Sequence, residues 1–314
     1  MPRLALALLA ATAIAASTTQ AATTPVDSAA AAEPPANLVL DRIDQRGLPL
    51  DGQFTYPDSA GEGVTIYVVD TGVRFSHNDF AGRAVSGPDF VDGDDDASDC
   101  NGDGTALASI AAGASYGVAK KATVVSVRAL DCDGSGTTAD LVQAIDWVAQ
   151  DAAGKPAVAL LGWGGSASDA VDQAVTNAVA SGVTVAVPAG GSGTDACQFS
   201  PARVPGALTV GGTVTDTDER ADRSNTGGCL DLFAPSTDAT AASCQDDTSA
   251  TPWSGTSTAA ALTAGAAALY LGLHHDAGPS TVAEELTANA TPDVVKNPGE
   301  GSPNLLLYTA FMND

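Results

Sequence analysis

The chain has 314 residues, of which 44% are hydrophobic, so it is long enough to bury one substantial core. Its 38 acidic and 13 basic side chains give a formal net charge of −25. Such a charge repels nucleic acids and anionic membranes, and it favours solubility or cation binding instead.

The first 21 residues have the pattern of a cleaved secretory signal peptide. Arg3 supplies a basic start, an apolar run extends from Leu4 to Ala16, and small residues continue to Ala21. A membrane anchor is the less favoured alternative, because this alanine-rich run is too short to span about 30 Å of hydrocarbon. Residues 22–38 are rich in Ala and Pro and are predicted to be a flexible lead-in. We therefore expect a secreted, extracellular protein that is not inserted in a membrane.

One domain is predicted over residues 39–314, in which strand-like and helix-like segments alternate from residue 64 onward. The predicted strands are residues 64–69, 122–130, 157–163, 183–189 and 207–212. Amphipathic helices are predicted over 138–153 and 166–182, and a buried helix over 255–273. This alternation is typical of an α/β fold with a mostly parallel, twisted β-sheet covered by helices on both faces. Its functional crevice is expected beyond the carboxyl ends of the strands.

Three segments carry a more specific signal than periodicity. They are VVDTGVRFSHNDFAGRA (68–84), YGVAKKATVVSVRALDCDGSGT (116–137) and WSGTSTAAALTAGAAALYLG (253–272). Together they resemble the subtilisin-like serine peptidases, and within them the proteinase K and aqualysin branch. The resemblance extends in order over nearly all of residues 38–309. It implies the subtilisin-like three-layer fold and a site built from Asp, His and Ser, with an Asn side chain that binds the oxyanion.

Two of these four site positions have changed. By motif position, Asp70 in DTG matches the orienting aspartate and Ser257 in SGTS matches the nucleophile. The family's NGHGTHVAG reads NGDGTALAS here, so Asp103 stands where the general base is expected. The family's AAGN reads PAGG, so Gly191 stands where the oxyanion Asn is expected. A serine hydroxyl is a poor nucleophile without a neighbouring base, and the resemblance therefore implies a catalytically inactive pseudopeptidase.

Three other functions stay open, and the first is weak hydrolysis by Ser257 with the remaining backbone donors. Asp103 beside Asp70 would form a like-charge pair with one raised pKa, which suits a carboxylate base at acid pH. The sedolisins, which share the general fold, use such a carboxylate, but theirs is usually the longer Glu. That alternative is an active serine endopeptidase in which Ser257 works with the two carboxylates. The third possibility, an acidic extracellular structural protein, requires only the fold and the charge.

The three histidines do not offer a substitute base. His274 and His275 follow Ser257 by about 17 residues along one predicted helix, a separation of about 25 Å. His77 lies in a loop where active relatives commonly carry a His as well, so a structural role is expected for it.

The cleft of the family binds peptides as an added strand between two edges, a mode that does not require the catalytic residues. The first edge reads DGSG here, and the second reads GWGG where the family has SLGG. Trp163 is compatible with stacking on a ligand, with plugging a specificity pocket, or with filling space. The expected partner is a peptide, a protein inhibitor or an active relative. The resemblance assigns substrate binding to Asp133, Gly134, Ser135, Gly136, Gly162, Trp163 and Gly164.

Structural calcium is the implied cofactor. Oxygen-bearing groups suited to this hard cation occur in two sets. Bound calcium and plain surface charge are the alternatives for both sets, as they are for the acidic run DGDDDASD at residues 92–99. The first set is Asp41, Asp44, Gln45, Asp51 and Gln53, and the second is Asp231 with the backbone carbonyls of Pro205 and Ala207.

Five cysteines in an exported chain suggest two disulfides and one leftover thiol. Zinc is not expected, because no CxxC spacing occurs. The resemblance implies the bridges Cys100–Cys132 and Cys197–Cys229, which leaves Cys244 without a partner. A monomer is expected, with a dimer through Cys244 as the alternative.

Overall fold

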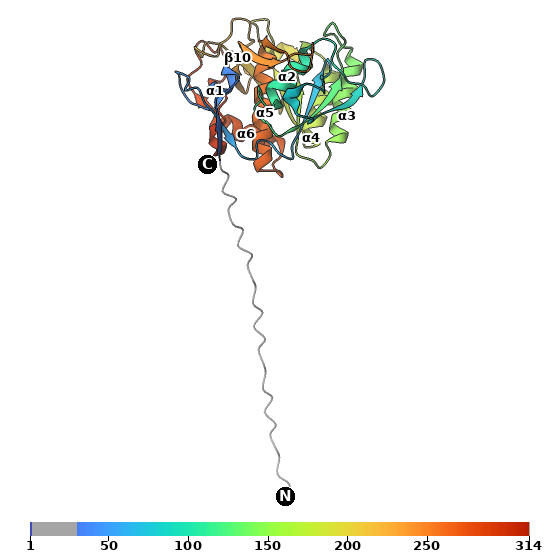
Figure 1. The fold of residues 1–314 in the computed structure, drawn as a ribbon, viewed down its shortest axis with the longest axis horizontal. Helices are drawn as coiled ribbons and strands as arrows, with labels where there is room; N and C mark the ends of the chain where they lie inside the picture. The colour runs from blue at the N-terminus through green and yellow to red at the C-terminus, as the bar shows by residue number, and fades with distance from the viewer. Residues whose placement is uncertain (2–29, 314) are drawn as a thin grey trace.

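The structure is a computed structural model that describes Met1 and residues 30–313 (Figure 1). The predicted signal peptide and residues 22–29 of the predicted lead-in lie outside the described residues. The described chain forms one body around a long central helix, α5 (Thr256–Leu273).

A large twisted sheet divides this body. Among the described residues it has nine strands in the order β14-β15-β11-β10-β8-β6-β3-β5-β4. Neighbouring strands are parallel except for β14 and β15. All five predicted strands are confirmed, as β3, β5, β6, β8 and β10. The bounds are β3 (Thr65–Asp70), β4 (Ala84–Asp89), β5 (Thr123–Arg128), β6 (Ala157–Leu161), β8 (Thr184–Pro188), β10 (Leu208–Thr213), β11 (Leu232–Pro235), β14 (Thr291–Pro292) and β15 (Leu305–Leu306).

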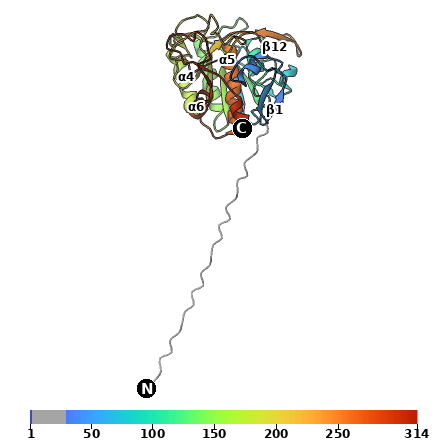
Figure 2. The same ribbon diagram turned by 90° about the vertical axis from the view of Figure 1, so that its left-hand side faces the viewer.

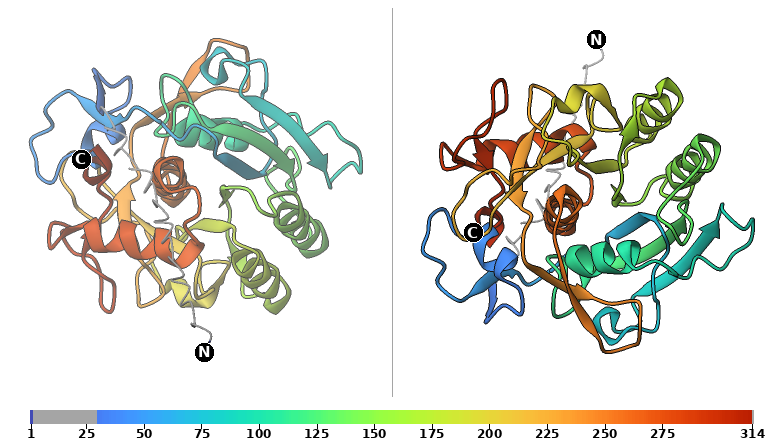
Figure 3. Two further views of the ribbon diagram at one scale, coloured as in Figure 1. Left: turned by 90° about the horizontal axis from the view of Figure 1, so that it is seen from below. Right: turned by 90° about the horizontal axis from the view of Figure 1, so that it is seen from above.

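Side chains alternate between the two faces of the sheet and build a separate core on each. Val68 and Leu160 face one core, where α2 (Asp103–Ala112), α5 and α6 (Pro279–Asn289) pack. Their neighbours Tyr67 and Leu161 face the other core, which α3 (Thr138–Asp151) and α4 (Asp169–Ala180) cover. Figure 3 shows α5 end-on at the centre and the pair α3 and α4 on the opposite side. The predicted three-layer α/β fold is therefore confirmed.

Helix α5 passes through the middle of its layer and packs closely on α2. By composition it could span a membrane, but 78% of it is buried inside the protein. A Cβ added at Gly265 would lie 2.7 Å from the carbonyl oxygen of Ala111 and 2.6 Å from the Cβ of Val118. Because only Gly fits at this contact, the two helices approach each other closely in the core.

One element differs from the prediction for the N-terminal lead-in. Residues Ala30–Glu33, expected to be flexible, form strand β1 and pair with β2 (Phe54–Pro57). Glu33 fixes this strand, because its carboxylate lies 2.9 Å from the Lys120 ammonium and accepts a hydrogen bond from the Tyr56 hydroxyl. A four-residue edge strand rich in Ala carries no periodic pattern, so only its tertiary partners reveal it. Figure 2 shows β1 on the same side of the body as β12 (Ala239–Ala242).

Short elements complete the described chain. Strand β12 forms a hairpin with β13, and β7 pairs with β9. The remaining bounds are β7 (Gly165–Ser166), β9 (Phe199–Ser200), β13 (Ala250–Trp253), α1 (Leu38–Ile43) and the 3-10 turns η1 (Asn78–Phe80), η2 (Ala196–Gln198) and η3 (Ala310–Asn313).

Both predicted disulfides are confirmed. Cys100–Cys132 joins the loop before α2 to the loop after β5, and Cys197–Cys229 joins η2 to the segment before β11. Cys244 is a half-buried free thiol.

Candidate active site

Asp70 lies at the carboxyl end of β3 with only 2% of its surface exposed. The Thr71 N–H donates to its Oδ1 at 2.8 Å. Gly162 follows the neighbouring strand β6, and a Cβ there would lie 2.3 Å from Asp70 Oδ2, so glycine leaves room for the carboxylate. Burial raises the pKa of Asp70 to about 7, and the charges of Asp103 and Asp99 act in the same direction.

Asp103 is the first residue of α2, and the close approach of two glycines places it near Asp70. A Cβ added at Gly104 would lie only 2.1 Å from the Gly72 carbonyl oxygen. The Gly104 N–H also donates to Thr71 Oγ1 at 3.1 Å. These contacts hold the start of α2 against the loop that follows β3. Burial raises the pKa of the half-buried Asp103, and the charge of Asp99 adds to the effect.

Asp99 organises the loop between these two aspartates. Its Oδ1 accepts hydrogen bonds from Thr71 Oγ1 and from the backbone of Asn101 and Gly102. Its Oδ2 accepts from the backbone and hydroxyl of Thr105 in α2. No sequence motif singled out Asp99, which belonged to the acidic run 92–99, although the Asp-x-Asn-Gly spacing fits an N-terminal turn.

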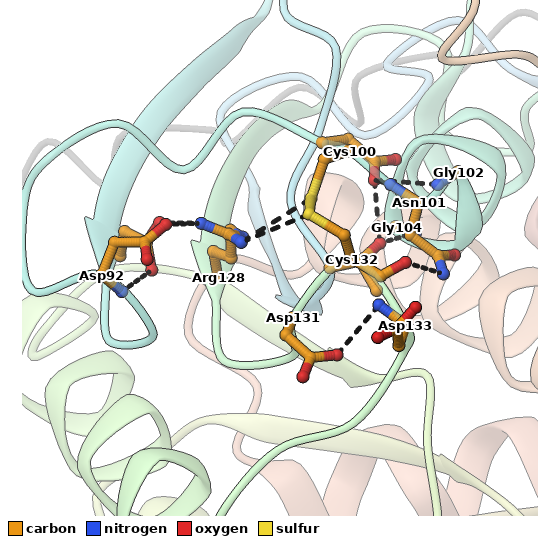
Figure 4. Close-up of a disulfide and its surroundings, with 12 residues drawn as sticks. Asp92, Cys100, Asn101, Gly102, Gly104, Arg128, Asp131, Cys132 and Asp133 are labelled. Atoms are coloured by element: carbon orange, nitrogen blue, oxygen red, sulfur yellow. Dashed lines mark hydrogen bonds and ion pairs between the residues drawn. A yellow bond between two sulfur atoms is a disulfide. The ribbon is translucent and has the colours of Figure 1, made fainter.

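The rest of that acidic run also serves local structure. Asp92 pairs with Arg128 at 2.6 Å, and Figure 4 shows this pair beside the Cys100–Cys132 disulfide. Asp94 and Asp96 accept hydrogen bonds from backbone N–H groups two residues further on. Within residues 30–313, no three His, Cys, Asp or Glu side chains converge in a metal-binding arrangement.

Ser257 lies in the first turn of α5, at the same edge of the sheet. Gly255 precedes the helix with a φ of 146°, a conformation that favours glycine. The Gly190 N–H, from the loop after β8, donates to Thr256 Oγ1 at 3.2 Å and ties that loop to the helix start. Ser257 is half-buried, and in the described part of the chain its hydroxyl has no hydrogen-bond partner.

A cavity of about 720 Å³ opens beside Ser257. Gly162, Gly164 and Gly191 line it, together with Arg223 from the loop before β11. A Cβ added at Gly191 would have no atom within 4 Å, so the space expected to hold the Asn side chain is free. The structure thus brings Asp70, Asp103, Gly191 and Ser257 to one edge of the sheet, as the motifs predicted. Arg223 was not predicted, because no motif marks it.

The two predicted cleft edges border a second, smaller cavity of about 270 Å³. Gly134 and Gly136 line it from one side, and Trp163 and Gly164 from the other. Asp133 and Ser135, predicted to bind substrate, are exposed and do not line either cavity. Their N–H groups instead donate to the Asp131 carboxylate, which fixes the turn.

Trp163 lines the smaller cavity and is absent from the lining of the large one. Its indole N–H donates to the Val69 carbonyl at 3.0 Å, and its ring packs against the core under α3 and α4. The side chain is half-buried and forms a wall of the smaller cavity. Trp163 therefore leaves the large cavity beside Ser257 open, and its role toward a ligand stays a prediction.

No histidine provides a base for Ser257. His77 is buried, its Nδ1 accepts from the Asp79 N–H, and its Nε2 lies 3.0 Å from the Ser249 carbonyl oxygen. Both of its ring nitrogens are thus engaged. His274 follows the last residue of α5 and stacks on Tyr270, with the ring centroids 4.5 Å apart.

The residues of the first predicted calcium set lie close together, although no three acidic side chains of residues 30–313 form a metal-binding group. Asp41 is 1% exposed and accepts hydrogen bonds from the backbone of Asp51 and Gly52. Asp44 is buried, and its Oδ1 has no hydrogen-bond partner. Burial raises the pKa of Asp44 to about 6, and the charges of Asp51 and Asp41 contribute. Gln45 accepts from the Asp51 N–H, whereas the exposed Gln53 side chain donates to the Gly52 carbonyl.

The second predicted set lies where β10 and β11 begin side by side. Asp231 precedes β11 and accepts a hydrogen bond from the Thr209 N–H at 2.7 Å. Burial raises its pKa to about 6. Pro205 and Ala207 lie just before β10 on the neighbouring chain segment. A carboxylate whose ionised form is disfavoured in this way would gain from a bound cation.

Comparison with known proteins supports the assignment from the motifs. The profile of the subtilase family matches residues 61–305. An extracellular serine proteinase from a Thermus species is 52% identical over 281 residues, which are 90% of this chain and 68% of that protein. The alkaline serine exoprotease A of Vibrio alginolyticus is 48% identical over 285 residues, 91% of this chain and 52% of that protein.

A solved structure gives the same result for the fold. The crystal structure of a cold-adapted subtilisin-like serine proteinase matches with a TM-score of 0.83 and 47% identity, over 87% of this chain and 97% of that chain. Fold, site and sequence thus define a subtilisin-like α/β protein. The chain belongs to the subtilase family. It spans between about half and two thirds of the length of the two relatives above.

Proposed function

We propose that the protein is a secreted subtilisin-like pseudopeptidase that binds peptide segments in its cleft without cleaving them. One observation carries the proposal: Ser257 lines an open cavity of about 720 Å³, while the first residue of α2, where the family motif has an imidazole, is the carboxylate Asp103. The two predicted cleft edges border a cavity, which supports strand addition by a peptide. The group that would activate the serine is missing.

The chemistry of Asp103 supports the proposed inactivity. A carboxyl group has an ordinary pKa of about 4 and an imidazole about 6.5, so an ionised Asp is the weaker base toward a serine hydroxyl. Asp70 cannot help, because its normal task is to stabilise a positively charged imidazolium that does not form here. Its own pKa of about 7 means that it is partly protonated at neutral pH. Removal of the base costs a related enzyme about 10⁶-fold in turnover.

The changed oxyanion position acts in the same direction. Gly191 offers no side-chain donor to a developing negative charge, although the N-terminus of α5 still favours one. Loss of this one donor costs a related enzyme about 10²- to 10³-fold in turnover. The two losses are not multiplied, because groups that act together are not additive.

A test of this proposal compares hydrolysis of casein by the natural protein, by Ser257→Ala and by Asp103→His combined with Gly191→Asn. The assay is scanned from about pH 3 to 9 with calcium present. We expect no activity in the natural protein and recovered activity in the double variant, since the space at position 191 is free. Activity in the natural protein that Ser257→Ala abolishes would overturn the proposal.

The acid-peptidase alternative has one observation in its favour. The pKa of both Asp70 and Asp103 is raised, as a carboxylate base at acid pH requires. Labelling of Ser257 by a fluorophosphonate probe separates the two functions. Strong labelling at acid pH that Asp103→Asn removes would establish the enzyme, whereas the pseudopeptidase stays unlabelled across the range.

Peptide binding is tested separately from turnover. The same test distinguishes a peptide-binding protein from a purely structural one. Gly191→Trp fills the large cavity, and Gly278→Trp places the same side chain in open space at the start of α6. We expect fluorescence anisotropy of a labelled peptide pool to fall with Gly191→Trp and to be unchanged with Gly278→Trp. A structural protein would respond to neither substitution.

Calcium is proposed as a structural cofactor at the two oxygen-rich sets. Asp44 and Asp231 would hold it, because their ionised forms are disfavoured without a positive charge nearby. We expect chelation to lower the free energy of unfolding at pH 8 by about 1–3 kcal/mol. The effect should fade below about pH 6, where protonation of both carboxylates competes with the cation. An equal melting temperature with and without chelator at pH 8 would contradict this.

A further inference from the structure

Arg223 lies in the large cavity next to the position of the missing oxyanion Asn. It is exposed, and its Nε donates to the Gly191 carbonyl at 3.1 Å. Gly190, the preceding residue, is hydrogen-bonded to Thr256, and Thr256 precedes Ser257. A continuous chain of contacts therefore connects the guanidinium to the start of α5.

The backbone of Arg223 is fixed in this place. Its carbonyl accepts from the Gly193 N–H at 2.9 Å, and the Asn225 N–H donates to the Gly190 carbonyl at 2.9 Å. Asn225 is fully buried, and its side-chain oxygen accepts from the Ser192 N–H. The segment 223–225 and the loop 190–193 thus form one hydrogen-bonded unit, which carries the cation at the cavity wall.

The guanidinium of Arg223 has no counterion among residues 30–313. Arg42 pairs with Asp218 and Arg128 pairs with Asp89, and both of these carboxylates are buried. Within the described residues Arg223 forms no ion pair, although the chain has a net charge of −25. The nearest candidate, Asp222, lines the same cavity without pairing with it.

We infer that Arg223 makes the cleft select ligands that place a carboxylate beside Ser257. This inference rests on the proposed function, peptide binding without turnover. A guanidinium offers a planar fork of N–H donors that matches a carboxylate, and only its Nε is engaged here. A carboxylate keeps its charge permanently, whereas the oxyanion of a peptidase exists only during reaction. The space left by Gly191 is where such a group would fit.

Two sources of carboxylate are possible, the free C-terminus of a peptide and an acidic side chain. The negative charge of Asp222 on the cavity wall opposes both, so the preference depends on Arg223. Binding through either kind of carboxylate should depend on Arg223. Peptide pairs that differ in only one of the two carboxylates distinguish the sources.

The experiment uses four probes with the natural protein at neutral pH, and mass spectrometry verifies that each stays intact. Two are N-acetyl-Ala-Ala-Leu-Phe as the free acid and as the amide. Two are N-acetyl-Ala-Ala-Leu-Glu-amide and its Gln counterpart. Calorimetry gives each Kd. We expect one of the two acidic peptides to bind about five- to tenfold more tightly than its neutral partner. A preference in the Phe pair would identify the free C-terminus as the source of the carboxylate, and a preference in the Glu/Gln pair would identify the acidic side chain.

The matched variants are Arg223→Gln and Lys155→Gln, which remove the same charge. Lys155 precedes β6 and lies at the opposite end of the sheet from the cleft. Arg223→Gln should abolish the preference and leave binding of the neutral peptides intact, and Lys155→Gln should change neither. Arg223→Lys should keep part of the preference.

The outcomes separate the two proposals. Equal binding of acids and neutral peptides by the natural protein would overturn the carboxylate preference and leave peptide binding standing. If Arg223→Gln still prefers acidic peptides, another group causes the preference, and this result would also overturn the inference. Failure of all four peptides to bind would count against the proposed function itself.

Discussion

Helices α2 and α5 begin in the same way but present different side chains in their first turn. Each starts after a glycine with positive φ, Gly102 at 123° and Gly255 at 146°, and neither has a side-chain cap. The start of α5 still presents Ser257, in the sequence SGTS that its family uses. The start of α2 presents Asp103 in place of a histidine.

The close contacts of both helices are nevertheless intact. Gly104 in α2 touches the loop after β3, and Gly265 in α5 touches α2. We therefore expect chemistry and packing to be separable here: the half-buried side chains of Asp103 and Ser257 should tolerate exchange, whereas a Cβ at Gly104 or Gly265 would overlap neighbouring atoms. Substitutions at these helix starts should therefore fall into two groups, with large and small changes in the free energy of unfolding.

The largest effect is expected for Gly104→Ala. Its Cβ would lie 2.1 Å from the Gly72 carbonyl oxygen, so the helix start or the loop must move. We expect a loss of about 3 kcal/mol or more in the free energy of unfolding, measured by urea denaturation. Gly191→Ala is the control, because it meets no atom within 4 Å and should cost less than about 1 kcal/mol. Similar losses in the free energy of unfolding for Gly104→Ala and Gly191→Ala would contradict the distinction between packing and cleft positions.

Asp70→Asn is expected to raise the free energy of unfolding, by an amount smaller than the loss expected for Gly104→Ala. The pKa of Asp70 rises from an ordinary value near 4 in the unfolded chain to about 7 in the folded protein, so stability falls as pH rises through this window. Removing the charge should therefore stabilise the protein at pH 8 by about 2–3 kcal/mol and leave it unchanged at pH 4.

Thermal unfolding at both pH values measures this difference. Asp222→Asn, at an exposed position of the cavity wall, is the matched control and should have little effect at either pH. A stabilisation by Asp70→Asn that does not depend on pH would contradict the burial argument.

The smallest effect is expected for Ser257→Ala. The hydroxyl is half-buried and has no hydrogen-bond partner among the described residues, so its removal leaves no group unsatisfied. We expect a change below about 0.5 kcal/mol in the free energy of unfolding. A larger loss would mean that the start of α5 depends on the serine that it presents.

The sequence predicted the long, periodic elements well, because burial of one or both faces requires a regular spacing of hydrophobic residues. All five predicted strands and the three predicted helices are present, with α4 beginning at Asp169 and not at residue 166. The motifs also placed Asp70, Asp103, Gly191 and Ser257 correctly at one edge of the sheet. Their functional roles stay predictions.

What escaped prediction depends on contacts between distant segments. Strand β1 exists through Glu33 and its partners in β2 and at Lys120. The position of Trp163 follows from one hydrogen bond to Val69. Arg223 has no neighbours in sequence that mark it, and only the folded loop brings it to Gly191. Local pattern cannot encode such pairings.

The Cys100–Cys132 disulfide has a practical consequence for anyone who produces this protein. It joins the residues just before α2 to the turn that borders the smaller cavity, and the Asn101 side chain adds a hydrogen bond to the Cys132 carbonyl at 2.9 Å (Figure 4). Material made in a reducing cytosol would lack this covalent tie. Its cleft wall would be held by hydrogen bonds alone, and a weak binding result from such material would report on the host compartment and not on the protein.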